Sequence, residues 1–205
     1  MRPAVIIAVT VAFLLLSRRS MAATITAEMR KGSAQRLTVN VDGVVYRTNY
    51  ARLPIVPNVW TTISRADTIR QIRALGLPDA VGINIYALIV AEAAKVADGF
   101  KGLNNNYAGV QTDSGVWGYN NFTGQTARID SGNVPRMFAT FDNFQGFIEF
   151  IENRLKAKGF DAVTDAAEWA KRYVSNWWGV PQTPQNIRDK AAIYTSAAAA
   201  WRAAR

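Results

Sequence analysis

The chemistry open to this chain is limited first by the residues that it lacks. Its 205 residues include no histidine and no cysteine. This excludes imidazole and thiolate metal sites, disulfides, cysteine nucleophiles and relays that pair serine with histidine. Acid–base chemistry must therefore rest on Asp, Glu, Tyr or Lys, and we expect neither a metal nor a cofactor.

One carboxylate is distinguished by its position. Glu92 follows Leu88 by four residues and Ile89 by three, on the apolar face of a helix predicted to begin at a capping Asn84 and to continue until Gly99. Burial disfavours the ionised form of a carboxyl group and raises its pKa, as a general acid working near neutral pH requires. The alternative is that Glu92 lies at the edge of the apolar stripe and reaches water.

The elements that must position Glu92 are predicted from apolar periodicity and turn residues. A helix capped by Ser64 or Asp67 precedes the Glu92 helix, and residues 100–140 are rich in Gly, Asn, Thr and Ser, as in a small β region with many loops. Three helices follow it: one capped by Thr140 or Asp142, one capped by Asp165, and one from about Gln185 to Ala204.

The N-terminal part of the chain predicts a membrane segment and a β-hairpin. Residues 3–17 are almost entirely apolar but reach only about 22 Å as a helix, against ~30 Å of bilayer hydrocarbon. They therefore indicate a signal peptide or a short membrane anchor within residues 1–23. Residues 24–35 predict a linker. Two β-branched runs, 36–41 and 44–50, then flank Asp42-Gly43, which is typical of a tight hairpin turn.

The predicted fold class is therefore α+β, with a mainly helical body and a small β lobe. We expect four parts: the membrane segment (1–23), a linker with the β-hairpin (24–57), the α+β domain (58–180), and a basic amphipathic C-terminal helix (181–205).

The positive charge lies at the two ends of the chain. The net charge is +9, but residues 61–180 carry 12 basic and 12 acidic side chains. A neutral middle argues against a nucleic-acid partner, whereas basic ends suit an anionic surface such as lipid headgroups or envelope polymers. The C-terminal helix, with Arg188, Lys190, Arg202 and Arg205, could contact wall polymer, membrane or a protein partner.

Three ordered motifs resemble those of the bacterial and phage glucosaminidases of the lysozyme superfamily. They are Glu92, the segment Asn105-Asn106-Tyr107-Ala108-Gly109-Val110, and the run from Arg136 to Asp142 followed by Phe147, Phe150 and Ile151. In that family a helical Glu is followed by Asn-Asn-x-Phe-Gly-Ile. The similarity covers about residues 60–178. The chain departs from the family at Ala93-Ala94-Lys95, where Ser or Gly and often Trp occur, and at Ala108, where Phe occurs.

The resemblance implies a lysozyme-like fold and hydrolysis of the β-1,4 bond after N-acetylglucosamine in peptidoglycan. Glu92 would be the general acid, and Asn105 and Asn106 would begin the loop into the β lobe and shape the floor of the cleft. Glycoside hydrolysis also needs a second group that activates water, acts as nucleophile, or supports a substrate acetamido group. Asp113 is the first candidate for that group and Asp130 the second, although Asp is common in turns.

Aromatic side chains in the predicted β region are candidates for stacking on sugar rings. Core packing is the alternative for each of them, and for Tyr173, which could line the cleft from a helix. The candidates are Tyr107, Trp117, Tyr119, Phe122 and Tyr173.

The sequence thus predicts a membrane-anchored or exported peptidoglycan hydrolase of a bacterial envelope or a phage particle. A muramidase or lytic transglycosylase on the same fold would cut the neighbouring bond. The alternative from another class is a non-catalytic structural or wall-binding protein that keeps the fold, and the altered residues after Glu92 motivate it.

Overall fold

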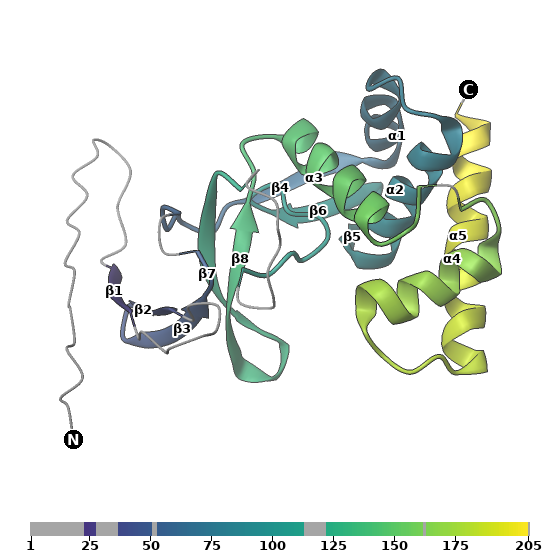
Figure 1. Cartoon of the computed structure of the whole chain (residues 1–205). Helices are drawn as coiled ribbons and strands as arrows, with labels where there is room; N and C mark the ends of the chain where they lie inside the picture. The colour runs from purple at the N-terminus through teal and green to yellow at the C-terminus, as the bar shows by residue number, and fades with distance from the viewer. Residues whose placement is uncertain (1–22, 28–36, 51–52, 113–121, 162, 205) are drawn as a thin grey trace. The chain divides into compact units, whose positions relative to one another are not determined.

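A computed structural model describes residues 23–27, 37–50, 53–112, 122–161 and 163–204 (Figure 1). The chain forms two compact units: unit 1 comprises residues 1–59 and 109–142, and unit 2 comprises residues 60–108 and 143–205. Small antiparallel sheets and helices occupy separate stretches of the chain. The α+β class is therefore confirmed.

Unit 1 is built from two antiparallel sheets. The first has the order β1 (Ala23–Ala27), β2 (Leu37–Val41) and β3 (Val44–Thr48), and the second pairs β7 (Gly124–Asp130) with β8 (Val134–Thr140). A 3₁₀ turn, η1 (Ser131–Asn133), joins β7 to β8. Buried side chains from both sheets form one core: Val39, Val41, Tyr46, Ala127 and Met137.

The hairpin of unit 1 forms where its turn residues predict it. Val41 pairs with Val44, and the two residues between them, Asp42 and Gly43, have φ angles of 51° and 83°. Asp and Gly accept this left-handed conformation, which a type I′ turn requires. The predicted linker at 24–35 is wrong for its first residues, because Ala23–Ala27 pairs with β2 as a third strand. Its Thr-Ile-Thr centre is β-branched and suits a strand.

Unit 2 combines one small sheet with the helices. Its sheet has the order β4 (Trp60–Ser64), β6 (Gly99–Leu103) and β5 (Ala94–Val96), all antiparallel. Its helices are α1 (Arg65–Ala74), α2 (Asp79–Glu92), α3 (Phe144–Ala157), α4 (Ala166–Arg172) and α5 (Pro184–Ala203), and a π-helical turn, η2 (Tyr173–Trp178), follows α4 directly. Helix α5 packs against both α2 and α4 (Figure 1).

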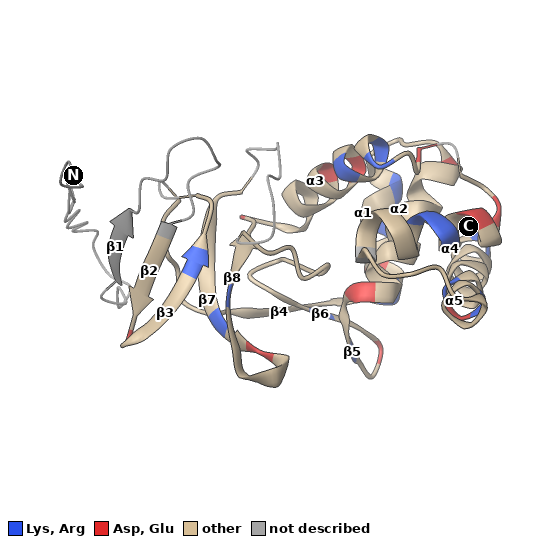
Figure 2. Cartoon of the chain, turned by 60° about the horizontal axis from the view of Figure 1, so that its bottom comes forward, with Lys and Arg blue, Asp and Glu red and all other residues tan. Residues whose placement is uncertain are grey.

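The last helix is part of the core of unit 2. Tyr194, Ala197, Ala198 and Trp201 are buried on one side of α5. Its other side carries exposed charges that include Arg188 and Arg202, while α3 carries charges of both signs (Figure 2). Contact of α5 with a wall polymer, a membrane or another protein therefore stays a prediction for its exposed side alone.

The helix caps follow the sequence at α1 and α4 but not at α3. Ser64 caps α1 by accepting a hydrogen bond from the Asp67 N–H at 3.0 Å, and Asp165 caps α4 in the same way. The predicted caps of α3, Thr140 and Asp142, are wrong. Thr140 is the last residue of β8, and the cap is Asn143, whose side-chain oxygen accepts from the backbone N–H of Gly146 at 2.9 Å.

Replacing Asn143 with alanine is expected to lower the free energy of unfolding by about 1 kcal/mol, because the Gly146 N–H loses its acceptor at the helix start. The same change at the exposed neighbour Asp142 is expected to alter it by less than about 0.5 kcal/mol. Urea denaturation of both variants measures the difference. An equal loss in the two variants would contradict the assignment of Asn143 as the cap.

Within the part of the chain that the structure describes, no helix is long and apolar enough to cross a membrane. The predicted anchor or signal segment at 1–23 lies outside that part, apart from its last residue, Ala23, which begins β1.

Candidate functional site

Glu92 is the last residue of α2, a helix whose boundaries differ from the predicted ones. The helix begins at Asp79, after Pro78, and not at Asn84. Asn84 lies buried inside it and donates from its side-chain amide nitrogen to the Phe160 carbonyl at 2.6 Å, so this nitrogen is bound by a distant loop and the residue is not a cap. The helix ends at Glu92 and not near Gly99, because the chain turns extended at Ala93 and pairs as β5 with β6.

The Glu92 side chain is half-buried and contacts residues of η2. The Tyr173 hydroxyl donates to its Oε1 atom, and the Trp177 indole N–H donates to the same carboxyl group. The ammonium Nζ of Lys190, on α5, lies 4.7 Å from the centre of the Tyr173 ring. Three segments of unit 2 that are far apart in sequence thus meet at one carboxyl group.

Burial is the main influence on the ionisation of this group. It raises the pKa of Glu92 above its usual value, while the Tyr173 hydrogen bond, the charge of Lys190 and the Trp177 hydrogen bond act in the opposite direction and only partly offset it. The position of Glu92 at the carboxyl end of α2 also disfavours a negative charge. Burial, and then the neighbouring carboxylate, also raise the pKa of Tyr173, which therefore stays protonated as a donor.

The π-helical turn explains how two donors reach one acceptor. The apolar spacing after Asp165 predicts one regular helix with Tyr173 and Trp177 on its inner side, but the helix widens at Tyr173 into a π turn that continues to Trp178 and is capped by Gly179. Such turns displace side chains relative to a regular helix and are frequent at functional sites. Tyr173 itself is fully buried and stacks on Trp169 at 5.1 Å between ring centres. Its ring belongs to the core, and its hydroxyl belongs to the site.

The predicted Asn-Asn motif forms a tight turn after β6. Asn104 and Asn105 have φ angles of 49° and 60°, a left-handed conformation that Asn tolerates better than other residues with a side chain. Leu103 and Asn106 close the turn through mutual backbone hydrogen bonds. The motif therefore reverses the chain at the end of a strand, and its contact with substrate stays a prediction.

The two described aromatic candidates of the predicted β region lie in cores. Tyr107 is buried in unit 2, where its hydroxyl donates to Thr61 at 3.1 Å and its ring packs edge-on against Phe144. Phe122 is buried in unit 1 between Tyr50 and Phe141. Neither ring presents an open face for sugar stacking, because neighbouring aromatic rings cover both.

The remaining predicted site residues are not brought together with Glu92 by any described contact. Asp130 ends β7 in unit 1, directly before η1, whereas Glu92 belongs to unit 2. Asp113, Trp117 and Tyr119 lie outside the described residues. Among the residues that the structure does describe, no three His, Cys, Asp or Glu side chains form a group that could hold a metal ion.

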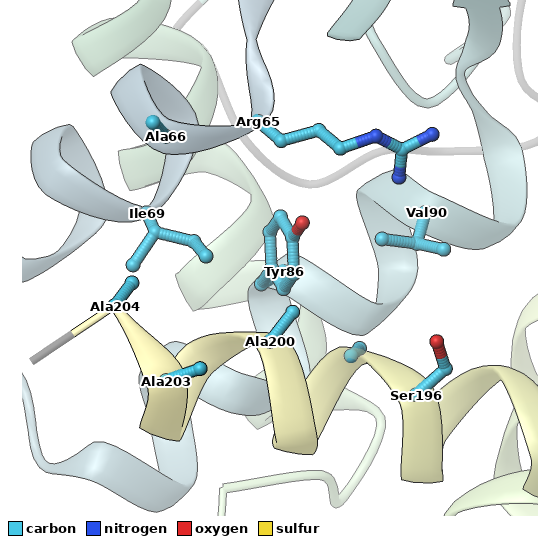
Figure 3. Close-up of a pocket in the computed structure, with 10 residues that line it drawn as sticks. Arg65, Ala66, Ile69, Tyr86, Val90, Ser196, Ala200, Ala203 and Ala204 are labelled. Atoms are coloured by element: carbon cyan, nitrogen blue, oxygen red, sulfur yellow. The ribbon is translucent and has the colours of Figure 1, made fainter. Parts of the chain in front are cut away.

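A separate hollow of about 380 Å³ lies between α1, α2 and α5 in unit 2 (Figure 3). Its lining is mostly apolar and includes several alanines of α5, with Arg65, Tyr86 and Ser196 as polar members. Burial raises the pKa of the Tyr86 hydroxyl, and the neighbouring Arg65 opposes that shift. No carboxylate lines this hollow, so the acid–base chemistry suggested by Glu92 is not located there.

Comparisons of the chain with protein-family models, with curated proteins and with solved structures find no match. The resemblance to glucosaminidases therefore stays a prediction. What supports a function is the local geometry of Glu92 and its neighbours.

Replacing Lys190 with methionine is expected to raise the pKa of Glu92, because the change removes the positive charge that favours the carboxylate while it keeps the length of the side chain. A general acid must be protonated, so the high-pH limb of the activity profile should move to higher pH. The profile of kcat/KM against pH measures this shift. The exposed Lys171→Met is the control, and a shift to lower pH in Lys190→Met would contradict the assignment.

Proposed function

We propose that this protein is a peptidoglycan hydrolase with a lysozyme-like fold that cleaves the β-1,4 bond after N-acetylglucosamine. The observation that carries the proposal is Glu92: a half-buried carboxyl group at the end of an apolar helix, with a raised pKa and a fixed orientation. These are the properties of a general acid that protonates a leaving oxygen. The substrate class comes from the resemblance to glucosaminidases, in which a helical Glu is likewise followed by an Asn-Asn motif.

In this mechanism Glu92 protonates the oxygen of the scissile bond. Tyr173 and Trp177 hold the carboxyl group by donating to it, and they stabilise the carboxylate that remains after proton transfer. A second group then activates water, forms a covalent intermediate, or supports the acetamido group of the substrate. Asp113 and Asp130 remain the candidates for that second group. Residues 1–23 would tether the enzyme to a membrane or export it, in a bacterial envelope or a phage particle.

The test is the chemical identity of the new chain ends. Purified peptidoglycan is incubated with the full-length protein, and the products are reduced and analysed by mass spectrometry. We expect N-acetylglucosamine at the reducing ends. Muramic acid ends would move the assignment to a muramidase, and anhydromuramic acid ends to a lytic transglycosylase. No new ends from folded protein that still binds peptidoglycan would favour the non-catalytic wall-binding alternative.

A further inference from the structure

The small sheet of unit 2 has one covered and one open face. Side chains alternate between the two faces of a strand, and directly paired residues share a face. Phe100, on β6, is fully buried and packs edge-on against Tyr86 of α2. Lys101, the next residue, therefore belongs to the opposite face, with its register partners Thr62 of β4 and Ala94 of β5. Both partners are exposed, so this face is open to solvent around Lys101, while Leu103 at its end, the register partner of Trp60, is buried.

The open face carries the most exposed tryptophan side chain among the described residues of unit 2. Trp60, two residues before Thr62 on β4, is 42% exposed. The Lys101 ammonium lies 4.6 Å from the centre of its ring, which orients the indole through a cation–π contact. The indole ring thus presents an apolar face to solvent in a fixed orientation, next to a positive charge.

The charge on this face indicates which kind of partner it can bind. Lys101 lies on this face, and the three strands contain no carboxylate, whereas Lys95 pairs directly with Phe100 and therefore belongs to the other face. Such a surface suits a partner that combines apolar C–H faces with negative charge. Sugar rings supply the first property by stacking on aromatic rings, and the carboxylates of muramic acid and its peptides supply the second.

The face also begins close to Glu92 along the chain. Glu92 lies two residues before Ala94, whose direct partner across the ladder is Lys101. Two extended residues and one inter-strand step place the Cα atoms of Glu92 and Lys101 within about 12 Å of each other. A glycan strand of several sugars that is cleaved at Glu92 could therefore extend over the sheet.

We infer that Trp60, Thr62 and Lys101 form a subsite for the glycan strand of peptidoglycan, in which a sugar ring stacks on Trp60 and an anionic group of the strand pairs with Lys101. This inference rests on the proposed function, since it extends the same substrate beyond the cleaved bond. It assigns Lys101 to recognition of charge and Trp60 to recognition of the sugar ring. The two contributions can be separated with one charged and one uncharged ligand.

The experiment measures ligand affinity by titration calorimetry in full-length protein that carries Glu92→Gln, so that ligands are bound and not cut. The probes are an uncharged N-acetylglucosamine hexamer and soluble peptidoglycan glycan strands. We expect Trp60→Ala to weaken both by about tenfold and Trp60→Phe to restore most of the affinity. Lys101→Gln should weaken only the anionic strands, by several-fold and less at high salt. Lys156→Gln, at an exposed lysine of α3, is the control.

Unchanged affinity for both probes in Trp60→Ala would overturn the subsite, while release of N-acetylglucosamine ends by the unsubstituted protein would leave the proposed function standing. Binding to phosphatidylglycerol vesicles that Trp60→Ala abolishes, with glycan affinity unchanged, would assign the face to a membrane instead. If the Glu92→Gln protein binds neither probe and the unsubstituted protein releases no ends, the subsite and the proposed function fail together.

Discussion

Replacing Glu92 with glutamine is expected to slow the release of reducing ends from peptidoglycan by a factor of about 10²–10⁴ while the protein stays folded. Glutamine has nearly the same shape and can still accept the hydrogen bond that Tyr173 donates to Oε1. It has no acidic proton to give to the leaving oxygen. The loss therefore measures proton transfer and not the removal of a packing group.

The control for this change is Glu149→Gln on α3, where a half-buried helical carboxylate accepts a hydrogen bond from Gln145 at 2.9 Å. That variant should keep full activity. Thermal unfolding of both variants checks that each is folded. If Glu92→Gln retains the activity of the unsubstituted protein, the acid is another group and the proposed mechanism is wrong.

The raised pKa of Glu92 also fixes the direction of the pH dependence. Activity that requires the protonated carboxyl group falls as the pH rises through that pKa, and burial places the fall at a higher pH than an exposed glutamate would give. In Glu92→Gln the residual activity should lack this limb. A limb that persists at the same pH would belong to a different ionising group.

The parts of this fold that the sequence predicts are those set by neighbouring residues. The turn at Asp42-Gly43 and the caps Ser64 and Asp165 depend on contacts within a few positions, and all three are found. Position 84 shows the limit of such local signals. An Asn before an apolar run resembles a cap, but its amide is bound by the carbonyl of Phe160, 76 residues further along the chain.

The candidate site is predictable to the same extent. The apolar spacing before Glu92 predicts a half-buried carboxyl group, and its raised pKa agrees with that prediction. The predicted continuation of this helix until Gly99 is wrong, because the helix ends at Glu92 and the chain continues as β5, on which Val96 lies exposed. The donor Tyr173 is 81 residues away, and Lys190 reaches the site from a helix for which the sequence predicts a surface role. Only tertiary packing reveals these two contacts.

The exposure of Trp60 likewise depends on which face of its sheet α2 covers.

Replacing Trp201 with alanine is expected to lower the free energy of unfolding by about 3–5 kcal/mol, because this side chain anchors α5 to unit 2. The ring is 1% exposed, and its indole N–H donates to Asp79 at 3.1 Å. The Arg73 guanidinium lies 4.7 Å from the ring centre. The ring packs on Gly82 so closely that a Cβ added there would lie 2.5 Å from it. Glycine is therefore the only residue type at position 82 that leaves room for the Trp201 ring.

Since α5 also carries Lys190, its loosening should affect the Glu92 site as well as stability. We therefore expect Trp201→Ala to reduce activity at temperatures where most of the protein is still folded, and Gly82→Leu to have the same effect by displacing the ring. Arg202→Ala, at the exposed neighbour, should change the unfolding free energy by less than about 0.5 kcal/mol. Urea denaturation measures stability, and reducing-end release measures activity. If Trp201→Ala loses stability but keeps full activity at low temperature, α5 supports the fold without contributing to the site.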